Sequence, residues 1–266
     1  MAVYSSITRH GTHEPFYLQI ARNQIYNHRH IFKFGNNPIV GNSIETIWSE
    51  GGLYSYLSAA TILKVSSSNT ADAEAGTGAR TVELFGLNAD YNEINETVTL
   101  NGQTAVNTTK EYLRINRMIV RSAGTGGQNA GIIYAGTGTV TSGVPANKYA
   151  TINGVEGSNQ SLMGLWTIPA GYTGFLVQYD ISNGTSTNTP AVCKVILSIR
   201  PFGEVFQSKD VKSLTTGMHI EERFSVPTVI TEKSDIEVRA VSSSASVNFD
   251  VSAAFEIIYI KNETLT

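Results

Sequence analysis

TVELFGLNADYNEINETVTLNGQTAV, from Thr81 to Val106, is the stretch that decides the predicted fold. At its centre Glu96–Leu100 runs into Asn101-Gly102, and Gln103–Val106 follows. Asn-Gly suits a type I′ turn between antiparallel strands, because both central residues of that turn need a positive φ. The sequence therefore predicts a β-hairpin here.

The incoming half of this stretch alternates between apolar and polar residues. Val98 and Leu100 fall on one face of a strand, and Thr97 and Thr99 fall on the other. One face is expected in a core and one in water, which fixes the register of the strand. No pair of residues in the stretch suggests catalysis.

Composition extends this reading to the whole chain. The protein has 266 residues, of which 41% are hydrophobic and only 15% are charged, so Ser, Thr, Asn and Gly fill many polar positions. This length allows one large β domain or two small ones. The single cysteine, Cys193, excludes a disulfide within the chain and is expected to be a small buried residue. The start has no apolar signal region, and no apolar run approaches the ~20 residues that span a bilayer.

The second half of the chain has the clearest strand patterns. In DIEVRAV, for example, Ile236, Val238 and Ala240 alternate with Glu237 and Arg239. Short runs of this kind, separated by turns, predict an all-β protein of about a dozen strands, a β-sandwich or jelly-roll-like fold. We expect one elaborated body over residues 34–266, and a division into two lobes near residue 145 is the alternative.

Residues 1–33 differ from the body and are interpreted as a basic N-terminal arm. They contain four Lys or Arg residues against the single acid Glu14, and four of the five histidines. Such an arm packs on its own body or a sister chain, or contacts a capsid surface; four dispersed cations are a small footprint for nucleic acid. The candidate partner-contact residues are Arg9, Arg22, His28, Arg29, His30 and Lys33.

No motif in the chain indicates catalysis, a cofactor or a metal. His28 and His30 share one strand face but would need further ligands to hold zinc. The acid pairs Asp72 with Glu74 and Glu93 with Glu96 are interpreted as exposed loop acids. Tyr91, Trp166 and Tyr172 could stack on sugars, although their spacing favours packing.

Several longer sequence segments, called words below, resemble those of a known family. They are ETIWSEGGLYSYL (Glu45–Leu57), GTGARTVELFGL (Gly76–Leu87), YNEINETVTLNGQTAV (Tyr91–Val106), WTIPAGYTGFL (Trp166–Leu176), RPFGEVFQ (Arg200–Gln207) and EKSDIEVRA (Glu232–Ala240). In these words the chain resembles virion structural, capsid decoration-like proteins of marine tailed bacteriophages, including cyanophages. The arm lies outside the resemblance.

The resemblance implies a non-enzymatic decoration or cement protein, made in the bacterial cytoplasm and placed on the capsid exterior. Its implied partners are the major capsid protein lattice and further copies of itself, in a homotrimer, with no membrane and no nucleic acid. The alternative is a tail or receptor-binding component that recognises host surface glycans. A polysaccharide-degrading enzyme with Asp72 and Glu74 in its site is a third reading.

Overall fold

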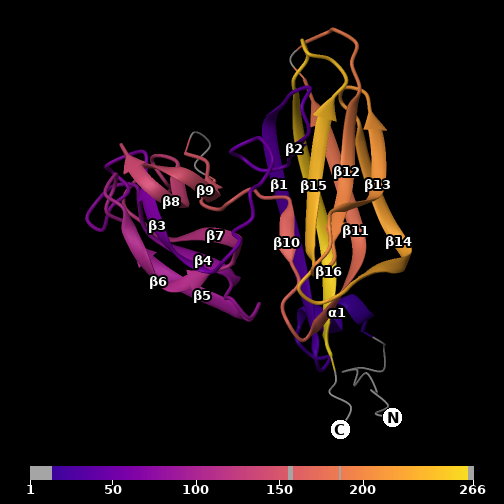
Figure 1. The fold of residues 1–266 in the computed structure, drawn as a ribbon, viewed down its shortest axis with the longest axis horizontal. Coiled ribbons are helices and arrows are strands. Elements are labelled where there is room, and N and C mark those ends of the chain that lie inside the picture. Colours follow the sequence, from indigo (N-terminus) through magenta and orange to yellow (C-terminus); the bar gives the residue numbers. More distant parts are fainter. Residues whose placement is uncertain (1–13, 155–157, 186, 263–266) are drawn as a thin grey trace.

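The computed structural model describes residues 14–154, 158–185 and 187–262, which form one short helix and 16 strands (Figure 1). The all-β prediction is confirmed, and the expected dozen strands was too few. The large lobe contains α1 (Phe16–Ala21), β1 (His28–Val40), β2 (Glu45–Thr46), β10 (Leu165–Thr167), β11 (Tyr172–Gly184), β12 (Cys193–Arg200), β13 (Gln207–Leu214), β14 (His219–Ile230), β15 (Asp235–Ser242) and β16 (Phe249–Lys261). The small lobe contains β3 (Thr61–Ser67), β4 (Ala79–Leu87), β5 (Glu93–Thr99), β6 (Val106–Tyr112), β7 (Arg114–Ala123), β8 (Ile133–Thr141) and β9 (Val144–Ile152).

The large lobe is built from two antiparallel sheets that share one core. One sheet has the strand order β1-β16-β11-β14, and the other has the order β10-β15-β12-β13 with β2 also paired to β15. Alternate residues of both sheets point inward, so that Tyr179 and Phe255 from the first sheet share a core with Leu197 and Val238 from the second. Cys193 is fully buried in the same core, as the sequence predicts. Helix α1 packs on the outer face of the first sheet through Ile20.

The small lobe repeats this plan with its own core. Its sheets have the orders β6-β3-β8-β9 and β5-β4-β7, and Leu63, Leu84, Met118 and Ile152 are among the residues that fill the space between them. Val98 and Leu100 are buried and Thr97 and Thr99 are exposed, so the predicted alternation is confirmed. The chain therefore has two cores, where the sequence favoured one body.

The small lobe is an insertion into the large lobe. β2 pairs with Arg239 and Ala240 of β15, and β10 pairs with the three residues from Asp235 to Glu237, so both lie in one line along the same neighbour. Val238 lies at the break, where its N–H donates to Gly164 and its carbonyl accepts from Ile47. The chain thus leaves and re-enters one sheet position, with the small lobe between. The alternative division near residue 145 does not coincide with the lobe boundary, since that residue lies within β9.

Close packing at this crossing requires glycine at position 35 of β1. A Cβ on Gly35 would lie 2.1 Å from the backbone nitrogen of Gly164 and 2.5 Å from the carbonyl oxygen of Ile47. No side chain fits these distances, because backbone atoms on both sides cannot move away independently. β1 therefore passes directly against the point where the insertion begins and ends.

The predicted hairpin over Glu96–Val106 is wrong. β5 pairs with β4, whereas β6 pairs with β3 in the opposite sheet. Gly102 has a φ of +58°, but Asn101 is not among the residues with positive φ, so the turn is not type I′. Asn101-Gly102 instead carries the chain from one sheet to the other, and the hairpin lies earlier, between β4 and β5.

The predicted boundary of the arm at residue 33 was also wrong. β1 begins at His28 and pairs with β16 from its first residue, so His28–Lys33 belong to the β body. Before β1 the described chain contains α1, which no pattern had predicted. No helix within residues 14–154, 158–185 and 187–262 is long and apolar enough to cross a membrane.

Asp72 is a structural residue and not the exposed loop acid that was predicted. Its carboxylate is fully buried and accepts hydrogen bonds from the Ser67 hydroxyl at 2.6 Å and from the N–H groups of Ala79, Ala130 and Gly131 at 2.7 to 2.9 Å. It holds the Ser68–Gly78 connection against the start of β8. Its lone pairs are occupied, which leaves no free oxygen for catalysis.

Candidate functional site

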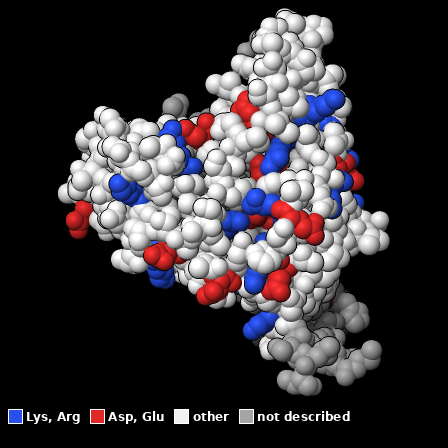
Figure 2. All heavy atoms as spheres, in the orientation of Figure 1, with Lys and Arg blue, Asp and Glu red and all other residues white. Residues whose placement is uncertain are grey.

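The residues with the strongest chemistry gather where the two lobes meet. Figure 2 shows few charged atoms over most of one face, with basic and acidic groups lying together near the middle of the molecule. Two clusters occupy this junction. We call the first the carboxylate cluster, built around Asp235 and Glu237, and the second the interlobe pocket, which contains Arg29, Arg117 and Trp166.

Asp235 is the centre of the carboxylate cluster. It begins β15, is 2% exposed, and accepts from the Arg114 guanidinium at 2.9 Å, the Arg200 guanidinium at 2.5 Å and the Thr167 hydroxyl at 2.5 Å. Arg114 comes from β7 of the small lobe, and the same guanidinium also donates to the carbonyl of Leu57 at 3.1 Å. Asp235 therefore ties the insertion to the large lobe.

Glu237 lies two residues along β15 and faces the same side. It is fully buried and accepts from the Tyr56 hydroxyl at 3.1 Å and from Arg239 at 3.0 Å, and it also binds the Thr46 hydroxyl. The alternation in DIEVRAV had marked this face as polar. It is polar, but the insertion covers it, so its charges are paired inside the protein.

Aromatic rings separate the guanidinium groups of the carboxylate cluster. Arg114 and Arg200 lie 4.9 and 4.4 Å from the ring centroid of Tyr56, and Arg200 and Arg239 lie 4.7 and 4.3 Å from that of Phe206. Each ring thus lies within cation–π distance of two guanidinium groups, which are attracted to the ring face. The cluster is complete within the chain, and we interpret it as the contact that fixes the two lobes together.

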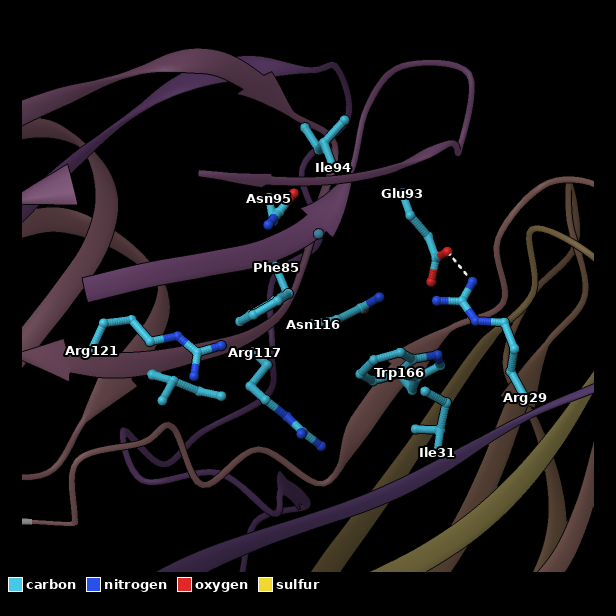
Figure 3. A pocket seen from close by; sticks show the side chains of 12 residues that line it. Arg29, Ile31, Phe85, Glu93, Ile94, Asn95, Asn116, Arg117, Arg121 and Trp166 are labelled. Carbon is cyan, nitrogen blue, oxygen red and sulfur yellow. Dashed lines mark hydrogen bonds and ion pairs between the residues drawn. The ribbon is translucent and has the colours of Figure 1, made fainter. Parts of the chain in front are cut away.

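The interlobe pocket is a cavity of about 510 Å³ on the other side of the β10 strand (Figure 3). β1, β4, β5, β7 and β10 form its walls. Its lining residues include three arginines, one glutamate, two asparagines and several apolar side chains: Arg29, Arg117, Arg121, Glu93, Asn95, Asn116, Ile31, Phe85, Ile94, Ile119 and Trp166.

Contacts between the lobes hold the pocket in place. Arg29 of β1 forms an ion pair with Glu93 of β5, drawn as a dashed line in Figure 3. Arg117 of β7 donates to the carbonyl of Phe32 at 2.6 Å. Arg121 pairs with Glu83 at 2.5 Å, and Glu83 also accepts from Asn95 at 2.6 Å. Among the described residues, Arg117 alone of the three pocket arginines has no carboxylate partner.

Lys33 lies behind this pocket and is 1% exposed. Its ammonium donates to the carbonyl of Asn116 at 2.6 Å and lies 5.9 Å from the ring centroid of Trp166. Burial and the neighbouring Arg117 hold the pKa of Lys33 well below its ordinary value. Burial likewise lowers the pKa of Arg117. The prediction that Lys33 contacts a partner is wrong, because its side chain is buried and its amino group is not exposed on the protein surface.

The other predicted contact residues do not form one patch. Arg22, just after α1, pairs with Glu14, and Arg29 faces the small lobe. His28 and His30 lie on the opposite side of β1, where His28 contacts the carbonyl of Tyr26 at 2.8 Å and His30 lies 3.3 Å from Glu256. Arg9 lies outside the described residues. No group of three or more potential metal-binding side chains occurs in the part of the chain that the structure describes.

Sequence reasoning missed Arg114, Arg117, Asp235 and Glu237 as members of a common junction. Arg114 and Arg117 lie on β7, and Asp235 and Glu237 lie on β15, whose DIEVRAV run was predicted as a strand. The available signal was the concentration of charge in two strands of a chain with few charges. Trp166 was predicted either to pack or to bind sugars; it is 7% exposed, its indole N–H donates to the Tyr259 hydroxyl, and one side of it borders the pocket.

Comparison with known proteins gives little beyond this geometry. No protein-family model matches the chain, and no curated protein matches it. Solved structures with some similarity include the Gx strain of infectious bursal disease virus, at 11% identity and a TM-score of 0.23, covering 90% of this chain and 72% of that chain. The Gt strain of this virus is similar at 11% identity and a TM-score of 0.21, covering 94% of this chain and 83% of that chain. The VP2 subviral particle of the virus is similar at 10% identity and a TM-score of 0.20, covering 89% of this chain and 77% of that chain. TM-scores this low do not establish a shared fold.

Proposed function

We propose that this chain is a non-enzymatic structural protein of a tailed-phage particle, and that it decorates the outer face of the capsid. The resemblance in Glu45–Leu57, Tyr91–Val106 and Glu232–Ala240 supports this assignment, since it reaches into both lobes. The occupied carboxylate of Asp72 counts against the glycan-degrading alternative.

The proposal includes a jelly-roll fold for the large lobe. Two facing sheets of order β1-β16-β11-β14 and β10-β15-β12-β13 support it, with β2 and β10 as two parts of one strand position. This order lets consecutive strands cross from one sheet to the other, as in the Greek keys of a jelly roll. Jelly rolls occur in viral capsid and lectin domains, among others.

The observation that carries the assembly role is an apolar surface at the α1 end of the large lobe (Figure 1). Phe16, Tyr17 and Leu18 of α1 are 49%, 61% and 48% exposed, and Tyr26 is 69% exposed. The Phe16 ring lies 5.7 Å from that of Tyr17 and 6.0 Å from that of His28. Adjacent apolar side chains of this size mark a contact with another protein. The proposed contact is the major capsid protein lattice, with a sister chain in a homotrimer as neighbour.

The test is the copy number of this chain in purified particles, measured by quantitative mass spectrometry against the main shell protein. A ratio that follows the shell lattice is expected of a decoration protein. A few copies per particle would overturn the proposal and favour a tail component.

A second experiment tests the apolar surface itself. Tyr17→Ser with Leu18→Ser should weaken attachment to particles that lack the protein, because the contact area is lost. Val226→Ser is the matched control, since Val226 is 80% exposed but lies on β14. Equal attachment of both variants would exclude α1 as the contact.

A tail component that recognises host surface glycans is the second candidate. The interlobe pocket favours it, because an aromatic wall beside amide and guanidinium groups suits a sugar. Binding of the purified protein to host cells or extracted surface polysaccharide tests it, and no binding across a range of hosts would count against it.

A further inference from the structure

The interlobe pocket has an uncompensated positive charge. Its three arginines face two glutamates, since Glu93 pairs with Arg29 and Glu83 with Arg121. Arg117 is the remaining cation, and its guanidinium has only the Phe32 carbonyl as a hydrogen-bond acceptor among the described residues. Arg117, which is partly buried, therefore lacks a counter-ion. An anion in the pocket would supply it, and such an interaction is strong where water is excluded.

Asn116 adds an unpartnered donor directed at the same space. It is 2% exposed, and its Oδ1 accepts from the Thr167 N–H at 3.3 Å, which fixes the orientation of the amide. Its Nδ2 has no hydrogen-bond partner among the described residues, and in Figure 3 it points to the side of the pocket where Trp166 and Arg29 lie. This donor faces the pocket and is free to bind an acceptor there.

The remaining wall is apolar and aromatic. Phe85 stacks under the Arg121 guanidinium with its ring centroid 5.5 Å away, and Trp166 is held by its bond to Tyr259. A volume of about 510 Å³ lies within the range of small-molecule sites. A bare phosphate would leave this wall unused. A sugar uses it, because its C–H groups can contact the apolar side chains that line the pocket while its hydroxyls meet the polar ones.

A peptide strand fits the pocket less well. Strand addition needs a free row of backbone groups along a sheet edge. The edge of β1 at the junction is already engaged, since the Phe32 carbonyl accepts from Arg117 and the Phe34 carbonyl accepts from the Met163 N–H at 3.1 Å.

We infer that the interlobe pocket binds an acidic saccharide, with a sugar carboxylate held by the Arg117 guanidinium and Asn116 Nδ2 and the ring against Trp166 and Phe85. The site uses both lobes, so its geometry depends on the carboxylate cluster that fixes them together. The inference does not rest on where the protein sits in a particle, and the purified chain suffices to test it.

The experiment is isothermal titration of the full-length protein with digalacturonate, with neutral digalactose and inorganic phosphate as separate arms. Digalacturonate should bind at least about 10-fold more tightly than either, which corresponds to about 1.4 kcal/mol. Equal binding of the neutral sugar, or phosphate binding as tight as the uronide, overturns the inference. So does no binding of digalacturonate.

Two variants test whether Arg117 and Asn116 bind the sugar carboxylate. Arg117→Gln keeps a donor for the Phe32 carbonyl but removes the charge, and Asn116→Asp keeps the acceptor for Thr167 but replaces the amide donor by an anion. Both should weaken digalacturonate binding about 10-fold or more and leave the weak binding of digalactose unchanged. Arg223→Gln is the control, since Arg223 lies on β14 with a 77% exposed side chain. Unchanged affinity in both pocket variants, with thermal unfolding as in the parent protein, overturns the assignment.

Discussion

The carboxylate cluster and the interlobe pocket lie at the same junction and differ in how their charges are matched. In the carboxylate cluster every guanidinium has a carboxylate partner: Arg114 and Arg200 share Asp235, and Arg239 pairs with Glu237. In the pocket, Arg117 has none among the described residues, and neither has Lys33 behind it. Both clusters include residues of β7 and β10, Arg114 and Thr167 in the first and Arg117 and Trp166 in the second. Charged groups that are all paired within the chain stabilise the fold. An unpaired cation beside a cavity is available to bind an anionic ligand.

The largest loss of stability is expected from a mutation in the carboxylate cluster. Asp235→Asn leaves Arg114 and part of Arg200 buried without a counter-charge, so the free energy of unfolding should fall by about 3 to 5 kcal/mol. Urea unfolding measures it. Asp250→Asn is the matched control, because Asp250 is exposed and binds the Asn36 amide at 2.6 Å, and it should cost at most about 0.5 kcal/mol.

The chain offers a separate probe for each lobe in the same experiment. Trp48 lies in the small-lobe core and Trp166 in the large-lobe core, and they are the two tryptophans of the protein. With Trp48→Phe or Trp166→Phe as background, the remaining fluorescence follows one lobe. The two transitions should coincide in the parent and separate in Asp235→Asn. Coincident transitions in both would show that this carboxylate does not couple the lobes.

Tyr56 sharpens the comparison by separating stacking from hydrogen bonding. Tyr56→Phe removes the hydroxyl that donates to Glu237 and should cost about 1 kcal/mol. Tyr56→Leu also removes the ring between Arg114 and Arg200 and should cost a further ~1 to 2 kcal/mol. Urea unfolding of both variants gives the difference directly. Equal losses would mean that the stacked ring contributes no more than a leucine.

Lys33 tests the unmatched charge through pH. Its pKa is lowered in the folded protein, so between that pKa and the ordinary value of 10.5 the unfolded chain binds more protons than the folded one. The cost of burying the ammonium is fully present below the folded pKa and disappears as the pH rises toward 10.5. The stability of the parent relative to Lys33→Met should therefore increase with pH in that window, by at most about 1.4 kcal/mol per pH unit. A difference that stays flat across it would show that Lys33 is not strained by burial.

The smallest effect is expected at the exposed ion pair of the pocket rim. Arg29 and Glu93 have side chains that are 46% and 36% exposed, so a double-mutant cycle with Arg29→Gln and Glu93→Gln should give a coupling below about 1 kcal/mol. Added salt should reduce it. A salt-independent coupling of several kcal/mol would mean that this pair behaves like the buried ion pairs of the carboxylate cluster. The two clusters would then not differ in this respect.

The local pattern of the sequence was sufficient for most strands and insufficient for their partners. The alternation at Val98 and Leu100 correctly marked the buried side of the chain at the end of β5. The Asn-Gly pair that follows was read as a hairpin, although it connects two different sheets. A turn residue constrains only its own φ and ψ. Gly102 can adopt its positive φ in a hairpin turn and equally in a connection between two sheets.

The site was harder to predict than the fold. Glu237 follows the alternation of a solvent-facing residue, but the insertion buries it. Lys33 is one of four dispersed cations that suggested a basic arm with partner contacts, but β1 buries it next to Trp166. Sequence periodicity reports which face of a strand a residue occupies, and not what covers that face.

The sequence by itself determined that the protein is all-β and that Cys193 is buried, because period-two alternation and turn residues act over a few neighbours. Only the tertiary structure decided that the small lobe is inserted between β2 and β10, that two cores form, and that Arg117, Asn116 and Trp166 meet in one pocket. Those outcomes depend on pairing between strands far apart in the chain. Asp235 and Arg114 are 121 residues apart, and their contact is selected by the packing of the whole chain.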